Sequence, residues 1–315
     1  MPRLPSRPAL FLLMACMAAV LFLLFNDFDK TRSLFISSIL DFGHIPLFMV
    51  ITAMVLWVLD WRSWPVTSLK NYILAGAIAI VLSLFTEIFQ QFVPGRSFEM
   101  RDIASNLVGS TVFLLIFYQY KRHMQQGCRL AIIGVACLLL LCAGIPVLTS
   151  FVEELRTKRD FPLLASFETR WEMKRWISEG SFDRSTLHAT HGKRSLQVNL
   201  TPGMYPGASF INPRFTWQDY YSLCFDAFLE GEDPLSITVR INDLLHNDQF
   251  EDRYNKTFTL MPGSNRIIID LSEVQHTPKG RLMDMDHIAI LCIFSYKLKE
   301  PRTVYFDNFR LEKDG

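Results

Sequence analysis

The sequence contains little cysteine and no paired-cysteine motif. Its 315 residues include six cysteines, and none of them stands in a Cys-x-x-Cys spacing. This pattern argues against a disulfide-rich scaffold and against a cysteine-ligated metal site. Cys224 and Cys292 are the two cysteines in the second half of the chain, where they could form a disulfide or remain free thiols. The other four lie in or beside apolar runs, as small buried hydrophobic residues do.

Excess charge and the common enzyme signatures are also missing. The chain has 32 Lys and Arg against 31 Asp and Glu, a formal charge of +1, and it has no basic stripe. We therefore expect no nucleic-acid partner. The phosphate-binding loop G-x-x-x-x-G-K-[ST], the nucleophile elbow G-x-S-x-G and the zinc-protease motif H-E-x-x-H do not occur. The sequence indicates no required cofactor.

Long hydrophobic runs are confined to the first half of the chain. Hydrophobic residues make up 50% of the sequence, yet charges are spread evenly only after about residue 160. Each run approaches the roughly 20 residues that cross a bilayer as a helix. The first run continues beyond Cys16, which favours an uncleaved anchor over a signal peptide. Five membrane helices are predicted near residues 9–25, 42–59, 72–91, 103–119 and 130–149.

Lysine and arginine in the short connections predict the orientation of these helices. Seven of these residues fall on the side of the N-terminus and four on the opposite side. Because cytoplasmic loops are richer in Lys and Arg, the N-terminus is predicted to be cytoplasmic. An odd number of spans then places a linker at 151–162 and a domain at 163–315 outside the membrane.

Polar residues interrupt the apolar pattern at residues 86–109. Glu87 and Gln90 are spaced i, i+3, and Asp102 and Asn106 are spaced i, i+4, so each pair shares one helix face. Glu87 falls near the C-terminal end of its helix, where the helix dipole and the hydrocarbon both disfavour a carboxylate. We therefore favour a functional role for Glu87. Asp102 is equally well explained as a helix N-terminal cap.

His44 and Arg96 lie on the same side of the predicted membrane as Glu87. An enzyme at the outer leaflet would use Glu87 or His44 as general acid or base and Arg96 to hold a phosphate, with Asp102 orienting them. Such groups suit a lipid head group or lipid phosphate as substrate. The same residues could instead form a structural clasp between helices, with Arg96 a solvated loop residue.

The combined pattern resembles the VanZ-like membrane family over about residues 20–120. The resemblance implies a small multi-helix membrane domain of the bacterial cell envelope, in the inner membrane. Its name-giving relatives are associated with low-level teicoplanin resistance, and no settled reaction follows. The residues that carry the motif are Asp41, His44, Glu87, Gln90, Arg96, Asp102, Asn106 and Gly109.

The second half of the chain has the pattern of an all-β sandwich. Short runs that alternate apolar and polar residues are separated by Gly, Pro, Asn and Asp. The clearest runs are SLQVNL, YYSLCFDAFL, LSITVRI, NRIIIDL, IAILCIFSY and TVYFDNFRLE. The predicted fold class is thus a membrane α-helical bundle followed by an all-β jelly-roll sandwich.

The segments SFET, THGKRSL, YPGASF and YFDNFRLE resemble carbohydrate-binding modules of the galactose-binding-like, jelly-roll type, over residues 163–313. The resemblance implies a glycan ligand, either an envelope polysaccharide or a lipid-linked saccharide. It also implies a structural calcium ion near the two ends of the domain, where Glu168 and Asp307 lie. Two carboxylates fall well short of the six to eight oxygen ligands that Ca²⁺ takes.

The polar stretch at 240–255 is the predicted glycan site within this domain. Sugar recognition needs planar hydrogen-bonding groups beside an aromatic face, and nearby Trp and Tyr residues could supply the face. A solvated loop with core aromatics explains the same composition. The candidate residues are Trp217, Tyr220, Asp243, His246, Asp252, Arg253, Tyr254 and Asn255.

Overall fold

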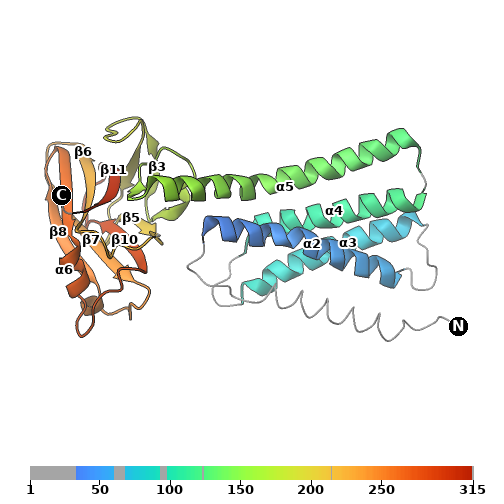
Figure 1. The fold of residues 1–315 in the computed structure, drawn as a ribbon, viewed down its shortest axis with the longest axis horizontal. Coiled ribbons are helices and arrows are strands. Elements are labelled where there is room, and N and C mark those ends of the chain that lie inside the picture. The colour runs from blue at the N-terminus through green and yellow to red at the C-terminus, as the bar shows by residue number, and fades with distance from the viewer. Residues whose placement is uncertain (1–32, 60–67, 93–97, 123, 214, 314–315) are drawn as a thin grey trace. The chain divides into compact units, whose positions relative to one another are not determined.

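A computed structural model describes residues 33–59, 68–92, 98–122, 124–213 and 215–313. The chain divides into two compact units, Met1–Glu154 and Leu155–Gly315. The first is helical and the second is built from β-strands (Figure 1). The predicted fold class, apolar helices followed by an all-β sandwich, is confirmed.

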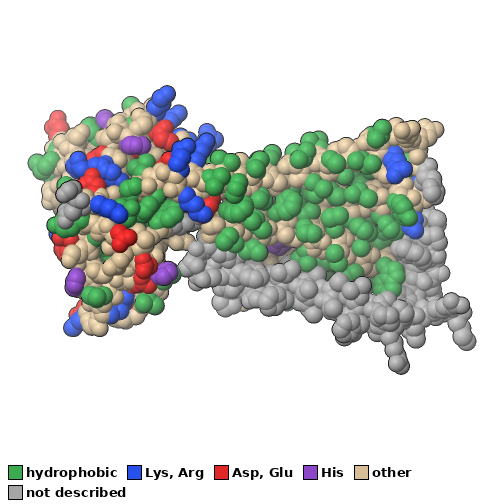
Figure 2. All heavy atoms as spheres, in the orientation of Figure 1, with side chains coloured by type: hydrophobic (Ala, Val, Ile, Leu, Met, Phe, Trp, Pro, Cys, Tyr) green, Lys and Arg blue, Asp and Glu red, His purple; other side chains and the backbone are tan. Residues whose placement is uncertain are grey.

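Four helices of the first unit are long and apolar enough to cross a membrane. They are α2 (Leu34–Leu59), α3 (Leu69–Gln90), α4 (Met100–Arg122) and α5 (Gln126–Asp160). They correspond to the second to fifth predicted spans, whereas the first, at 9–25, lies outside the described residues. Hydrophobic side chains cover the visible face of these helices, while charged side chains are spread over the sandwich (Figure 2).

Helix α5 is longer than a membrane span. Its 35 residues extend over about 52 Å at 1.5 Å per residue, against about 30 Å of hydrocarbon. The helix includes residues 151–160, most of the segment expected to be a linker. The charged stretch EELRTKRD at its C-terminal end is thus helical.

Helices α2 and α4 meet with their backbones close together. A Cβ atom added to Gly109 of α4 would lie 2.2 Å from the carbonyl oxygen of Ile45 in α2. Thr52 Oγ1 of α2 also donates a hydrogen bond of 2.9 Å to the Oγ of Ser110, the residue after Gly109. Small residues at such a crossing let two helices approach closely in a membrane. The contact fixes His44, which precedes Ile45, relative to α4.

Two antiparallel sheets form the second unit. The six-stranded sheet has the order β3-β4-β11-β6-β9, with β1 paired to β11. Its strands are β1 (Leu163–Ala165), β3 (Ser181–Ser185), β4 (Ser195–Leu200), β6 (Ser222–Leu229), β9 (Gly263–Asp270) and β11 (Arg302–Glu312). The five-stranded sheet has the order β2-β5-β10-β7-β8. Its strands are β2 (Trp176–Ser178), β5 (Gly207–Ile211), β7 (Leu235–Asp243), β8 (Tyr254–Leu260) and β10 (Ile288–Phe294).

Alternating side chains build the core of the sandwich. In β7, Ile237, Val239 and Ile241 are buried in the core, so Thr238 and Arg240 point to the opposite face of the sheet. The six strand-like runs seen in the sequence are confirmed as β4, β6, β7, β9, β10 and β11. Two short 3₁₀ segments, Glu172–Arg175 and Phe250–Asp252, and a short helix α6 (Leu271–His276) complete this unit as described.

Candidate functional site

The outer face of the five-stranded sheet carries a row of side chains from all five strands. Directly opposed residues of antiparallel strands point to the same face of a sheet. Cys292 of β10 stands opposite Ser209 on one side and Arg240 on the other. The row continues through the pairs Ser209–Ile177 and Arg240–Asn255. Five residues that are spread between positions 177 and 292 of the sequence thus lie side by side on one face of the sheet.

A cavity of about 490 Å³ lies over this row and is called the sheet-face groove below. Its residues are Ile177, Ser178, Glu179, Tyr205, Gly207, Ser209, Arg240, Arg253, Cys292 and Phe294. The Tyr205 ring centroid lies 5.6 Å from that of Phe294 and 5.5 Å from that of Tyr296. Tyr205 and Tyr296 are 49% and 53% exposed, so their rings remain accessible beside the groove.

Two guanidinium groups supply the polar side of the sheet-face groove. Arg240 stacks over the Phe294 ring at 4.8 Å, and its Nε donates to Asn255 Oδ1 at 3.1 Å. Among the residues that the structure describes, Arg253 Nε and Asn255 Nδ2 are buried without a hydrogen-bond acceptor. Burial, with the nearby charge of Arg240, lowers the pKa of Arg253. The groove therefore presents planar donors next to aromatic rings.

The aromatic residues predicted from the sequence to contact sugar lie elsewhere. Trp217 and Tyr254 are 0% and 1% exposed and belong to the core, where neither ring presents a face to solvent. Tyr254 stands opposite Ile241 of β7, which explains its inward direction. Tyr220 packs against the core and lies 5.4 Å from the Phe161 ring.

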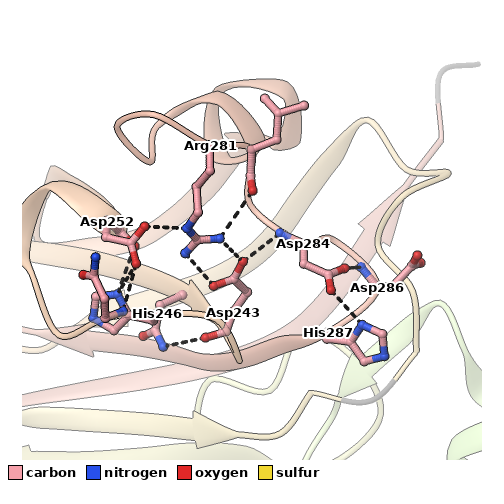
Figure 3. Close-up of polar contacts among 10 residues, drawn as sticks. Asp243, His246, Asp252, Arg281, Asp284, Asp286 and His287 are labelled. Atoms are coloured by element: carbon pink, nitrogen blue, oxygen red, sulfur yellow. Dashed lines mark hydrogen bonds and ion pairs between the residues drawn. The ribbon is translucent and has the colours of Figure 1, made fainter.

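Three polar residues of the predicted site belong to a cluster around Arg281 (Figure 3). Asp243 and Asp252 accept hydrogen bonds from Arg281, and His246 contacts Asp252. Arg281 Nη1 and Nη2 donate to the two carboxylate oxygens of Asp243 at 2.5 and 2.8 Å. Its Nε donates to Asp252 at 2.6 Å, and His246 Nδ1 lies 2.9 Å from the Asp252 backbone oxygen. The hydrogen bond from Arg281 holds the pKa of Asp252 well below its usual range. This cluster ties the 240–255 segment to the 281–284 loop.

The sheet-face groove therefore shares little with the predicted set. Of the eight predicted glycan-binding residues, Arg253 lines the groove and Asn255 adjoins it through Arg240. Sequence reasoning missed Glu179, Tyr205 and Arg240. The alternation in LSITVRI predicts that Arg240 points outward. It does not predict which strands pair with that strand, and so which residues lie beside Arg240.

The calcium ion expected near Glu168 and Asp307 stays a prediction, and both carboxylates accept hydrogen bonds from the backbone. Glu168 Oε1 accepts hydrogen bonds from the backbone N–H groups of Lys193 and Arg194 at 2.7 and 2.8 Å. Asp307 Oδ2 accepts from the backbone of Thr190 and His191 at 2.7 and 2.8 Å. One turn thus directs N–H donors at both carboxylates, whereas Ca²⁺ needs a cage of converging oxygens.

A second candidate site lies among the helices. His44 of α2 and Asn106 of α4 are hydrogen-bonded through Nδ1 and Oδ1 at 3.0 Å. The amide nitrogen of Asn106 donates to Ser83 Oγ of α3 at 3.0 Å. On the other side of the ring, His44 Nε2 lies 3.6 Å from Asp102 Oδ2. A short polar chain thus joins three helices.

Glu87 completes this group, called the helix cluster below. One potential ligand atom each from His44, Glu87 and Asp102 lies within 4.8 Å of the others, and all three residues are buried. Glu87 Oε2 also accepts a hydrogen bond from the backbone of Glu99 at 3.3 Å.

The other motif residues surround the helix cluster. Gln90 is buried, Gly109 lies at the α2–α4 crossing, and Asp41 forms an ion pair of 3.8 Å with Arg101. Arg96 lies outside the described residues. The structure thus brings together the predicted His44, Glu87, Asp102 and Asn106.

Comparisons with solved structures find carbohydrate-binding modules and glycoside hydrolases. A family 11 carbohydrate-binding module from Clostridium thermocellum, solved with a beta-1,3-1,4-mixed-linked tetrasaccharide, is 19% identical, and the match covers 48% of this chain and 94% of that one, with a TM-score of 0.39. An exo-beta-agarase is 14% identical, and the match covers 49% of this chain and 25% of that one, with a TM-score of 0.39. The match thus spans about a quarter of the agarase.

No family model matches the chain, and no curated protein matches it. The VanZ-like resemblance of the helical half therefore stays a prediction.

Proposed function

We propose that the β-sandwich is a glycan-binding domain and that the saccharide binds in the sheet-face groove. The observation that supports this is that the exposed Tyr205 ring and the guanidinium groups of Arg240 and Arg253 line one cavity. The exposed Tyr296 ring lies beside it, 5.5 Å from that of Tyr205. Binding sites for small ligands combine apolar and aromatic walls with a few placed polar groups. A sugar ring packs its C–H face on an aromatic ring and directs hydroxyl groups to planar donors beside it.

The proposal extends to where the domain acts. Four described helices that could span a membrane precede the sandwich. With the predicted first span at 9–25 they make an odd number of spans, and the Lys and Arg distribution favours an N-terminus in the cytoplasm. The sandwich would then lie outside the inner membrane of a bacterium, where it meets envelope polysaccharides or lipid-linked saccharides. The VanZ-like pattern of the helices suits an envelope protein and suggests a link to glycopeptide tolerance.

A binding experiment on the full chain in detergent tests the proposal. The protein is presented to a panel of envelope polysaccharides, peptidoglycan fragments and soluble oligosaccharides. The Tyr205→Ala variant is expected to bind at least about tenfold more weakly, a loss of ~1.4 kcal/mol. Tyr221→Ala is the matched control, because Tyr221 is similarly exposed at 52% and does not line the groove.

Two outcomes contradict the proposal. Equal loss of binding in Tyr205→Ala and Tyr221→Ala would place the ligand elsewhere. Absence of binding by the wild-type protein to every saccharide in the panel would remove the function itself.

The helix cluster favours a second candidate function, an enzyme at the outer leaflet that acts on a lipid head group or lipid phosphate. His44 and Glu87 are buried within reach of one another, an arrangement that suits general acid–base chemistry. Glu87→Gln is then expected to change the envelope lipid profile, while Glu99→Gln is not, because Glu99 is exposed. If Glu87→Gln alters only the abundance of the protein, the cluster is a structural clasp.

A further inference from the structure

We propose that His44, Glu87 and Asp102 form a binding site for a divalent transition metal of the zinc type. The site lies in the helical unit and stands independently of glycan binding by the sandwich. Each ligand comes from a different helix, α2, α3 and α4 respectively. One imidazole and two carboxylates are common zinc ligands, and three protein ligands leave a fourth position open.

The distances within the helix cluster suit a shared metal better than direct hydrogen bonds. His44 Nε2 and Asp102 Oδ2 are 3.6 Å apart, which is too far for a hydrogen bond. With metal–ligand bonds of about 2.0 to 2.2 Å, two ligands of a tetrahedral zinc ion lie about 3.3 to 3.6 Å apart. The third ligand atom, on Glu87, lies within 4.8 Å of the other two. A side-chain rotation that moves the carboxylate by about 1 Å brings it to bonding distance.

Asn106 sets the histidine in the form that binds a metal. Its amide nitrogen donates to Ser83 Oγ, so its carbonyl oxygen is the atom that faces His44 Nδ1. An oxygen there accepts a hydrogen bond, which places the proton of a neutral imidazole on Nδ1. The lone pair is then on Nε2, the nitrogen that faces Asp102. Metal-binding histidines generally donate their other N–H to an oxygen in this way.

The backbone around the helix cluster is held in place before any metal binds. The Gly109–Ile45 approach fixes α2 against α4, next to His44. The Asn106–Ser83 hydrogen bond joins α4 to α3, one turn before Glu87. A site with preset ligands loses little conformational freedom on binding. Glu87 and Asp102 also lie within one turn of the ends of α3 and α4, at Gln90 and Met100.

Burial gives a cation a further advantage at this position. Glu87 is 0% exposed and Asp102 is 6% exposed. Two carboxylates held a few ångströms apart in a medium of low dielectric repel each other when both are ionised. A divalent ion between them stabilises both charged forms. The imidazole nitrogen favours zinc and its neighbours over Mg²⁺ and Ca²⁺, which prefer oxygen ligands.

Metal content and Co²⁺ spectroscopy of the full chain in detergent test the site. We expect about one Zn²⁺ per chain after loading and dialysis, and a visible absorption band of tetrahedral Co²⁺ at one equivalent. Glu87→Gln and His44→Ala are expected to lose both signals. Glu99→Gln, which keeps the backbone N–H near Glu87, is the control that retains them.

Asn106 has the role of a positioning residue in this proposal. Asn106→Ala should weaken zinc binding about 10- to 100-fold, the usual effect of losing a partner of a metal-binding histidine. Unchanged zinc affinity in Asn106→Ala would show that Asn106 does not position the histidine, and this part of the proposal would be wrong.

The wild-type protein alone can overturn the site. Absence of zinc after loading, together with no Co²⁺ band at one equivalent, would show that the cluster does not bind such a metal. Retention of one zinc per chain in Glu87→Gln would place the metal on other residues. Neither result bears on saccharide binding by Tyr205, so failure of the two proposals can be told apart.

Discussion

Among the residues that the structure describes, two buried groups combine a histidine with two carboxylates, and they differ in which side chains converge there. In the sandwich, the guanidinium of Arg281 lies between Asp243 and Asp252 and donates to both. In the helices, an imidazole and two carboxylates converge from three helices to within 4.8 Å. The first group contains its own cation as part of the fold.

This difference separates a structural cluster from a candidate site. In the Arg281 cluster, the Asp243 carboxylate also accepts from the backbone of Asp284 at 2.7 Å, and Asp252 accepts from that of Asn247 at 2.9 Å. Such a network specifies how two loops meet. The helix cluster also combines one imidazole with two carboxylates, but a bound ion would shorten the distances between their ligand atoms.

Removal of the internal cation should have the largest effect on stability. Arg281→Met leaves the buried Asp243 carboxylate without its two guanidinium hydrogen bonds, and breaking a buried pair in this way costs about 3–5 kcal/mol. Chemical denaturation, monitored on the sandwich, measures the loss. Lys279→Met is the control, since Lys279 and Glu251 form an exposed ion pair, worth about 0–1 kcal/mol. Equal effects of the two variants would contradict a structural role for Arg281.

Separation of the helices should have the next largest effect, confined to the helical unit. Gly109→Ala would place a Cβ 2.2 Å from the Ile45 carbonyl oxygen, and crowding of a packed interface costs about 1–3 kcal/mol. The unfolding transition of the helices in detergent should fall, and that of the sandwich should not. Gly134→Ala is the matched control, because no atom lies within 4 Å of its added Cβ. A similar fall in both variants would argue against a close α2–α4 contact.

Acid should lower the stability of the sandwich through the Arg281 cluster, by a smaller amount than these substitutions. Arg281 lowers the pKa of Asp252 in the folded state, while the unfolded value is about 3.9. The contribution of Asp252 to stability is therefore present above about pH 4 and is lost as the pH falls below that value. Denaturation midpoints of the sandwich measured between about pH 7 and pH 2 check this. In Arg281→Met the decline below pH 4 should be shallower, and an unchanged decline would exclude Asp252 as its source.

Calcium should have the smallest effect. Because backbone N–H groups already occupy Glu168 and Asp307, neither added Ca²⁺ nor the chelator EGTA should shift the melting temperature of the sandwich. A rise with Ca²⁺ that disappears in Glu168→Gln would restore the calcium site implied by the sequence resemblance.

The helix cluster could be anticipated from the sequence to a greater extent than the groove. Spacings of three and four residues place Glu87 with Gln90, and Asp102 with Asn106, on single helix faces. Two such faces joined by a short turn come together, and His44 was expected on the same side of the membrane. The chain of bonds from Ser83 through Asn106 to His44 depends on how the helices rotate about their axes, which spacing does not determine.

The sheet-face groove depends on strand register, and register is a long-range property. Alternation predicts that Arg240 points away from Ile241, but it does not reveal that Cys292 and Ser209 are its neighbours across the sheet. The 240–255 segment drew attention because its polar residues are close in sequence. Asp243 and Asp252 instead turn toward Arg281, more than 25 residues further along.

The two cysteines of the sandwich have a practical consequence. Cys224 and Cys292 lie on different sheets, and each follows a core residue, Leu223 and Leu291, so both point away from the core on opposite outer faces. A disulfide between them is incompatible with this fold. Burial raises the pKa of the Cys292 thiol, so it should be alkylated slowly and mainly at alkaline pH. Since this thiol lies in the floor of the groove, its rate of alkylation can report occupancy by any ligand without a label on the ligand.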